Sequence, residues 1–171
     1  MNKDNLEIER KFLLKNVPDF NRNEIEKHLI HQIYVDVDGK KVRFRMSEKF
    51  NQKGISATDD ERHYVQCVKR VLSPGVFEEL ENEITKELFR DMSHREHSFI
   101  VKTRYVYEKD GLKWEVDEYH DIKMVTLEVE LDDINQEITI PEIIKKEVIT
   151  EVTGQKVFSN QSLSIKNDLV I

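Results

Sequence analysis

The chain has a single cysteine, Cys67, among its 171 residues, so it can form no internal disulfide and offers no cysteine-based metal site. Its six histidines do not follow a metal-binding spacing such as HExxH. It has no apolar run long enough to cross a bilayer and no signal-peptide pattern at its start. We therefore expect a soluble, cytoplasmic protein without a membrane partner.

Basic residues are not in excess either. The 27 Lys and Arg residues stand against 34 Asp and Glu residues, which gives a formal net charge of −7. Proteins that bind nucleic acid generally show a basic excess, so the balance argues against a nucleic-acid partner. With 38% hydrophobic and 36% charged residues, the chain is polar but not disordered in composition, and we expect one domain over residues 1–171.

The stretch Leu6–Leu14, LEIERKFLL, alternates charged and apolar side chains. On a strand, this period of two places Glu7, Glu9 and Lys11 on one face. Two carboxylates and an ammonium group suit a divalent metal beside a phosphate. Taken alone, the same pattern also fits a solvated strand face with alternating charges. Its recurrence along the chain is what favours the metal and phosphate interpretation.

The alternation recurs in residues 33–46, 63–70, 77–84, 99–119 and 126–131. Asp-Gly pairs at 38–39 and 110–111 predict two-residue hairpin turns, because both central residues of such a turn need positive φ. Ser73-Pro74-Gly75 predicts a further turn.

Three segments predict helices. Asp19 is a candidate N-cap for residues 19–29, and Thr85 is one for a helix of about two turns. Pro141 and Gly154 suit the first turn and the C′ position of a third helix. The polar residues 47–62 predict a loop between two strands.

The charged strand faces can be collected into one set. The cations are Lys11, Arg43, Arg45, Lys69, Lys102 and Arg104, and the anions are Glu7, Glu9, Glu79, Glu81, Glu83, Glu115, Asp117, Glu128 and Glu130. An open sheet could leave this face in water. A closed barrel could instead enclose it, and would then imply a bound polyanion and a metal, because isolated buried ions cost several kcal/mol each.

The ordered motifs EIERKF, QIYV, VRFR, VKR, ELENEI, VKTRY, WEVDEY, TLEVEL and EVTGQKVFSNQSL cover nearly the whole chain. Together they resemble the CYTH superfamily, the triphosphate tunnel metalloenzymes, with Glu7, Glu9 and Lys11 in the place of the ExExK signature. The resemblance implies an α+β, mostly antiparallel fold. That fold is a closed eight-stranded β-barrel, or tunnel, with peripheral helices. A C-terminal helix from Pro141 would flank one tunnel mouth.

The resemblance also implies roles for the charged residues. The substrate-binding residues would be Arg43, Arg45, Lys69, Lys102 and Arg104, and the catalytic residues Lys11 and Tyr34. The ligands of Mg²⁺ or Mn²⁺ would be Glu7, Glu9, Glu128, Glu130 and Asp117, together with Glu79, Glu81 or Glu83. We expect Tyr34 and neighbouring cations to lower the pKa of Lys11. Asn160 is expected to cap the last helical turn rather than to touch substrate.

The expected function is metal-dependent hydrolysis of a small-molecule triphosphate, with inorganic triphosphate as the first choice of substrate. A class IV adenylate cyclase and a thiamine or nucleoside triphosphatase are alternatives within the resemblance. A non-catalytic polyphosphate-binding protein is an alternative outside the enzymes. The acidic surface with exposed apolar strands is also compatible with a homodimer.

Overall fold

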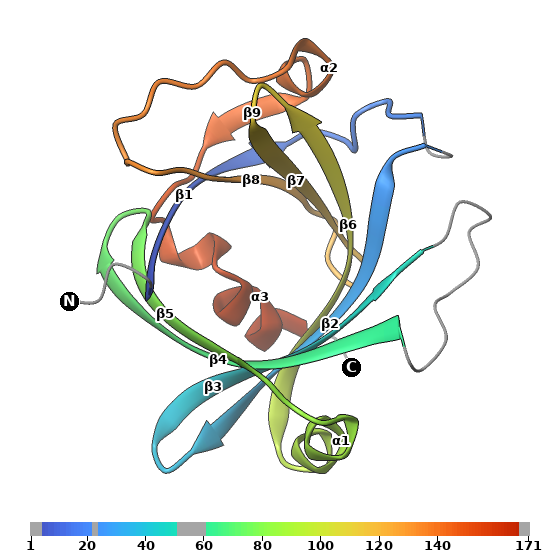
Figure 1. The fold of residues 1–171 in the computed structure, drawn as a ribbon, viewed down its shortest axis with the longest axis vertical. Coiled ribbons are helices and arrows are strands. Elements are labelled where there is room, and N and C mark those ends of the chain that lie inside the picture. Colours follow the sequence, from blue (N-terminus) through green and yellow to red (C-terminus); the bar gives the residue numbers. More distant parts are fainter. Residues whose placement is uncertain (1–4, 22–23, 51–60, 168–171) are drawn as a thin grey trace.

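The computed structural model describes residues 5–21, 24–50 and 61–167. Within these ranges the chain forms a nine-stranded antiparallel sheet in the order β5-β4-β3-β2-β6-β7-β8-β1-β9, and a further pairing of β5 with β1 closes the first eight strands into a barrel (Figure 1). The strands are β1 (Leu6–Leu14), β2 (Glu26–Val37), β3 (Lys40–Lys49), β4 (Arg62–Ser73), β5 (Val76–Glu83), β6 (His97–Lys109), β7 (Leu112–Tyr119), β8 (Val125–Glu130) and β9 (Val148–Glu151). The helices are α1 (Lys86–Ser93), α2 (Glu142–Lys145) and α3 (Asn160–Asn167), with a 3-10 turn at Lys156–Phe158. The predicted closed eight-stranded barrel with a C-terminal helix is confirmed.

The two Asp-Gly turns set the register of the hairpins. Asp38 and Gly39 have φ of 52° and 77°, and Asp110 and Gly111 have φ of 54° and 75°. Positive φ at both central positions gives a turn whose twist matches the right-handed twist of the flanking strands. The first turn joins β2 to β3 and the second joins β6 to β7, as the sequence predicts.

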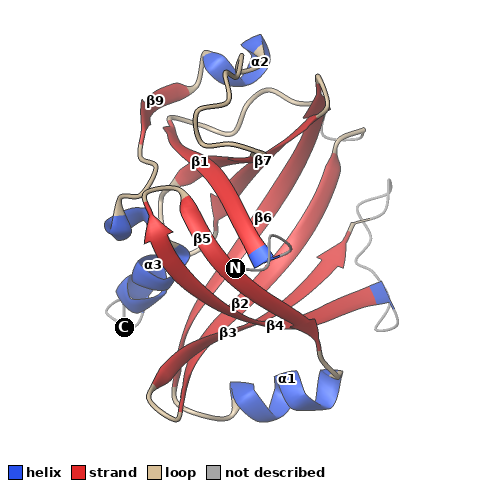
Figure 2. Ribbon diagram, turned by 60° about the vertical axis from the view of Figure 1, so that its left-hand side comes forward, coloured by secondary structure: helices blue, strands red, loops and turns tan. Residues whose placement is uncertain are grey.

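Strand β1 closes the barrel with two partners along one edge. Leu6–Ile8 pair with β5, and Phe12–Leu14 pair with β9, while the other edge of β1 pairs with β8 (Figure 2). The change of partner occurs where the Glu9 N–H donates to the Gly75 carbonyl at 2.9 Å. Gly75 has φ of +76°, and a Cβ there would lie 2.7 Å from the Glu9 carbonyl oxygen. The seam of the barrel therefore requires glycine at this position.

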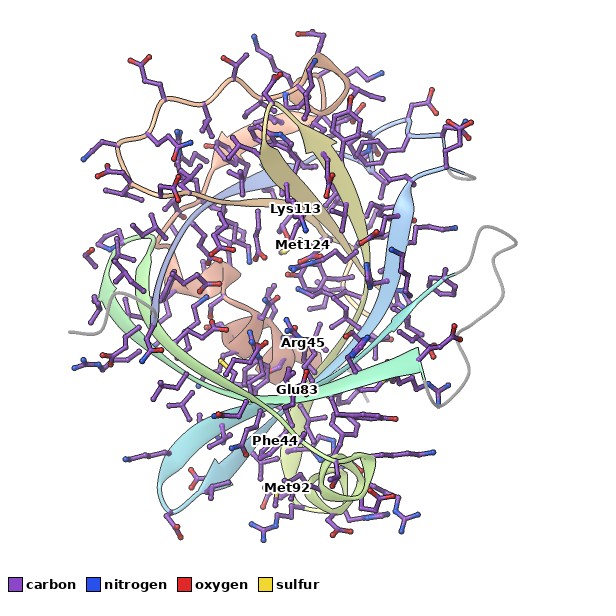
Figure 3. All side chains as sticks on the ribbon, in the orientation of Figure 1. Phe44, Arg45, Glu83, Met92, Lys113 and Met124 are labelled. Atoms are coloured by element: carbon purple, nitrogen blue, oxygen red, sulfur yellow. The ribbon has the colours of Figure 1, made fainter. Side chains whose placement is uncertain are left out.

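The apolar faces of the strands point away from the barrel axis and are covered by short elements. Trp114, Leu127 and Ile144 belong to the largest cluster, which lies under α2. Phe44 and the α1 residue Met92 pack in another cluster, and Figure 3 shows them together beside α1. Successive side chains on a strand point to opposite faces, so the residues next to these apolar residues along each strand must point into the barrel.

Two helix predictions are wrong. Within residues 19–29, β2 begins at Glu26 because its backbone pairs with both β3 and β6, and this pairing overrides a weak helical pattern. The helix predicted from Pro141 to Gly154 ends at Lys145, and Val148–Glu151 form β9. The reason is that β1 extends past β5 and leaves backbone groups that β9 pairs with.

The structure also tests the predicted cap at Thr85 and the predicted loop 47–62. The Thr85 cap is confirmed, since its side chain accepts a hydrogen bond from the Leu88 N–H. The predicted loop 47–62 is shorter at both ends, because β3 extends to Lys49 and β4 begins at Arg62, and residues 51–60 lie outside the described part. In the part of the chain that the structure describes, each helix is too short or too polar to cross a membrane.

Candidate active site in the barrel

The barrel encloses a cavity of about 680 Å³ to which each of its eight strands contributes side chains. The predicted site residues that line it are Glu7, Glu9, Lys11, Tyr34, Arg43, Arg45, Lys69, Glu79, Glu81, Lys102, Arg104, Glu128 and Glu130. Two predicted residues lie elsewhere. Glu83 is exposed near the end of β5, and Asp117 is fully buried behind the cavity wall.

Carboxylates gather on the wall formed by β7, β8 and β1. The strand register places Glu9 directly opposite Glu130, and Glu115 directly opposite Glu128. Like charges in directly opposed positions destabilise a sheet unless a cation lies between or beside them. Part of that charge comes from Lys11, which is paired with Glu128 across β1 and β8, and from Arg104, which contacts both Glu115 and Glu128.

Two carboxylates of β1 have raised pKa values, chiefly because they are buried. Burial raises the pKa of Glu7 to about 7, and the neighbouring carboxylates Glu9 and Glu79 act in the same direction. Burial also raises the pKa of Glu9, with Glu128 as the next cause. Several desolvated carboxylates in one wall fit a hard divalent cation, whose preferred ligands are carboxylate oxygens. The carboxylates of this wall that line the cavity and could hold such an ion are Glu7, Glu9, Glu115, Glu128 and Glu130. A second candidate group is Cys67, Glu79 and Glu81, whose ligand atoms lie within 4.8 Å of one another.

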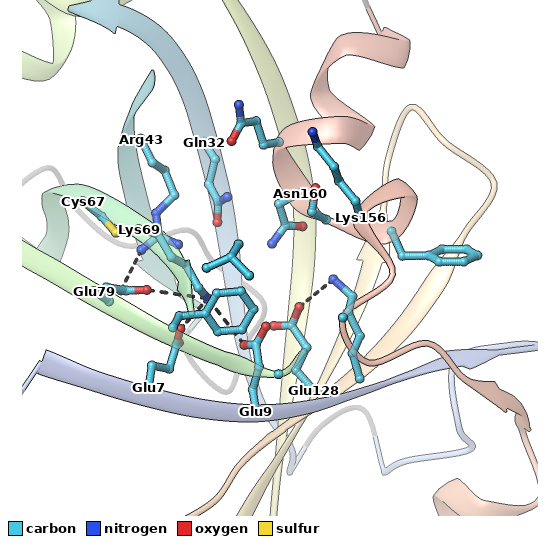
Figure 4. A pocket seen from close by; sticks show the side chains of 18 of the residues that line it. Glu7, Glu9, Gln32, Arg43, Cys67, Lys69, Glu79, Glu128, Lys156 and Asn160 are labelled. Atoms are coloured by element: carbon cyan, nitrogen blue, oxygen red, sulfur yellow. Dashed lines mark hydrogen bonds and ion pairs between the residues drawn. The ribbon is translucent and has the colours of Figure 1, made fainter. Parts of the chain in front are cut away.

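Cations occupy the wall formed by β3 and β4. Arg43 Nη2 lies 2.9 Å from Glu81 and 3.2 Å from Glu79, and Arg45 Nη2 lies 3.2 Å from Glu81. Lys69 contacts Glu7 and lies 3.7 Å from both Glu9 and Glu79 (Figure 4).

The Nε–H groups of Arg43 and Arg45 are buried and have no hydrogen-bond acceptor among the described residues. A buried donor without an acceptor costs about 1–3 kcal/mol. An anion in the cavity would remove that cost, and arginine forks match the oxygens of phosphate.

Lys11 does not have the lowered pKa that we expected. Its Nζ lies 2.8 Å from Glu128 Oε1. Burial acts to lower the pKa of Lys11, but the attraction of Glu128, aided by Tyr119 and Glu9, outweighs burial and raises it. The same contact helps to hold the pKa of Glu128 well below its ordinary value despite burial. Lys11 is therefore a firmly protonated donor in this cavity.

Tyr34 lines the cavity, and its hydroxyl accepts a hydrogen bond from Gln32 Nε2 at 3.1 Å. Burial raises the pKa of this phenol, so Tyr34 remains protonated near neutral pH. Tyr119 is among the main causes of the raised Lys11 pKa, and Lys11 in turn acts to lower the pKa of Tyr34 against the effect of burial. Lys11 thus interacts electrostatically with Tyr34 as well as with Tyr119.

The C-terminal segment supplies cavity residues that the strand pattern does not reveal. Lys156 and Asn160 line the cavity from the 3-10 turn and the start of α3 (Figure 4). Asn160 does not act as the cap: its Oδ1 accepts from the Tyr119 hydroxyl at 2.6 Å, and Ser159 Oγ instead accepts from the Ser162 N–H. Glu115 could have been assigned from its parity on β7, whereas Lys156 and Asn160 reach the cavity only through the tertiary fold.

No protein-family model matches the chain, and no curated protein matches it. Solved structures do. The chain is 24% identical to the inorganic triphosphatase NE1496, with a TM-score of 0.55 over 93% of this chain and 94% of that one. A structure described as the hypothetical protein NE1496 is 25% identical, with a TM-score of 0.54 over 93% and 97% of the two chains. A putative adenylate cyclase from Bacillus halodurans is 18% identical, with a TM-score of 0.51 over 91% and 100%.

Proposed function

Because the chain has the tunnel fold of the CYTH superfamily, we propose that it is a metal-dependent triphosphatase whose preferred substrate is inorganic triphosphate. The observation that carries this proposal is the cavity itself, where a wall of carboxylates and a wall of cations face one enclosed space. The similarity to a structure described as an inorganic triphosphatase supports the same reaction.

The cations of the cavity would bind the phosphates by replacing some of their contacts with carboxylates by contacts with phosphate oxygens. Arg43 and Arg45 are held by Glu79 and Glu81, yet each keeps a buried Nε–H that no described residue accepts. Phosphate oxygens can accept from these donors without breaking every existing ion pair. Arginine forks bind such oxygens through two parallel hydrogen bonds, which orients the chain of phosphates as well as neutralising it.

The carboxylates of β1 and β8 would hold the metal. A Mg²⁺ or Mn²⁺ ion bound by Glu7, Glu9 and Glu130 would neutralise phosphate charge and orient water for attack in line with the terminal phosphorus. Lys69, which contacts Glu7 and lies 3.7 Å from Glu9, lines the same cavity and could donate to a phosphate oxygen.

Lys11 has the properties of a charge-stabilising donor rather than a base. It is buried beside Glu128, and its pKa is raised, so it keeps its proton at neutral pH. An ammonium group held among the carboxylates of β1 and β8 can stabilise the charge that develops on the terminal phosphoryl group.

The aromatic lining bears on the choice between an inorganic substrate and a nucleotide. Phe77 and Phe158 line the cavity, and either could in principle stack on a base. The Lys69 ammonium already lies 4.0 Å from the Phe77 ring centroid, so one face of that ring is taken by a cation. ATP and thiamine triphosphate therefore enter the test as alternative substrates.

The test is an assay of phosphate release from the purified chain with Mg²⁺ or Mn²⁺. Inorganic triphosphate, ATP and thiamine triphosphate are supplied separately, and cyclic AMP is measured with ATP. Fast release from inorganic triphosphate supports the proposal. Cyclic AMP from ATP would assign a cyclase, preferential turnover of ATP or thiamine triphosphate would correct the substrate, and tight binding without turnover would assign a polyphosphate-binding protein.

A matched pair of variants tests the metal role. Glu130→Gln should reduce turnover about tenfold or more at limiting Mg²⁺ while the fold survives, because one carboxylate of the metal wall is lost. Glu137→Gln, on an exposed segment outside the cavity, is the control. Normal turnover of Glu130→Gln at limiting Mg²⁺ would contradict the metal role.

A further inference from the structure

Asp117 lies in the middle of β7 with its side chain fully buried, and both of its oxygens are occupied by cations. Lys102 Nζ donates to Oδ2 at 2.6 Å. Arg104 donates from Nε to Oδ1 at 2.7 Å and from Nη2 to Oδ2 at 2.8 Å. One carboxylate thus holds two cations of the cavity wall at once.

The strand register explains this bridge. Asp117 is directly opposite Arg104 across β6 and β7, and Lys102 is the next inward-facing residue along β6. Lys102 and Arg104 line the cavity, whereas Asp117 does not. The two cations therefore lie between the Asp117 carboxylate and any ligand in the cavity.

The bridge also fixes where the rest of the Arg104 guanidinium points. With Nε and one side of Nη2 directed at Asp117, Nη1 lies 2.5 Å from Glu115 and Nη2 also lies 2.9 Å from Glu128. A planar guanidinium held at this many points has little freedom to rotate. Asp117 thereby sets the orientation of a donor in the cavity without touching the cavity.

A metal-ligand role for Asp117 would require these contacts to break. Lys102 is as fully buried as Asp117, so breaking this ion pair would leave an uncompensated charge in the protein interior. Glu115 also contacts Arg104, but unlike Asp117 it lines the cavity, and it faces Glu128 directly across β7 and β8.

We propose that Asp117 is a positioning residue that holds Lys102 and Arg104 for phosphate binding, and that Glu115 is the β7 carboxylate of the metal site. The inference rests on the proposed function, since it assigns parts of the same site. It separates two inner-face acids, two residues apart, that the sequence pattern treats as equivalent.

Metal binding and anion binding are measured separately to test it. Asp117→Asn, Glu115→Gln and, as a control, the exposed Asp132→Asn are compared with the wild-type chain. Mn²⁺ binding is followed by electron paramagnetic resonance without substrate, and binding of inorganic triphosphate by calorimetry in EDTA. Asp117→Asn should weaken triphosphate binding by about 10- to 100-fold and leave Mn²⁺ affinity within about twofold of wild type. Glu115→Gln should weaken Mn²⁺ binding. A loss of Mn²⁺ affinity in Asp117→Asn, or unchanged triphosphate binding there, would overturn the proposal.

Asp117→Glu keeps the inference testable if Asp117→Asn does not fold. It retains the charge that neutralises Lys102 but displaces Lys102 and Arg104 by one methylene, so Mn²⁺ affinity should persist while triphosphate binding weakens. A wild-type affinity for triphosphate in a folded Asp117→Glu variant would count against positioning.

In steady-state kinetics, Asp117→Glu should raise KM for triphosphate without raising the Mg²⁺ concentration needed for half-maximal rate. If the wild-type chain binds both probes but releases no phosphate, the proposed function fails while the binding comparison still decides the role of Asp117.

Discussion

The pKa of Glu7 leads to a prediction about stability. Burial raises this pKa from 4.5 to about 7, so between these values the folded chain binds more protons than the unfolded chain. Stability contributed by protonated Glu7 is complete below pH 4.5 and is lost as the pH rises through 7. Glu7→Gln removes this titration, so the variant should become more stable relative to wild type as the pH rises.

The magnitude follows from the size of the pKa change. A rise from 4.5 to about 7 corresponds to about 3 kcal/mol, at about 1.4 kcal/mol for each pH unit. The Glu7 side chain is 26% exposed, so water screens part of this effect and about 3 kcal/mol is an upper bound. The difference in unfolding free energy between Glu7→Gln and wild type should therefore grow by about 2–3 kcal/mol from pH 4.5 to pH 8.

Urea unfolding in EDTA at a series of pH values measures this difference. Trp114 is the chain's one tryptophan and is 1% exposed, so its fluorescence reports unfolding. Glu137→Gln is the control for loss of a carboxylate outside the cavity. A difference that stays constant from pH 5 to pH 8 would refute the reasoning. Mn²⁺ should then reverse the order at pH 8, because a ligand that binds the folded wild type more tightly stabilises it more.

Three further predictions concern the cavity and the seam. Arg43→Ala should weaken binding of inorganic triphosphate by about tenfold or more in calorimetry, because a bidentate donor is lost; unchanged affinity would exclude Arg43 from the phosphate site. Lys11→Met should lower kcat more than it raises KM, and an effect on KM alone would assign Lys11 to ground-state binding. Gly154→Ala should lower the unfolding free energy by about 2 kcal/mol, since φ there is +71° and a Cβ would lie 2.5 Å from Pro74 Cβ; an unchanged Tm would show that the turn relaxes.

The strand pattern was readable because a period of two is a local property of the backbone. Alternation in Leu6–Leu14 predicts that Glu7, Glu9 and Lys11 share one face, and the Asp-Gly pairs predict two hairpins, both of which the structure contains. The helix signals at Pro141 and Gly154, by contrast, predict the wrong element beyond Lys145. Residues 148–151 pair instead with an edge of β1 that exists only once the barrel has closed.

The sequence by itself determined which residues share a face, and the resemblance of its ordered motifs predicted that this face lies inside a barrel. Only the tertiary structure decided which of those residues border the cavity and which lie behind its wall. Glu115 and Asp117 have the same parity, yet one borders the cavity and the other lies behind Lys102 and Arg104. Parity gives the direction of a side chain. The depth of that side chain, and the cations that contact it, depend on how the strands pack together around the closed barrel.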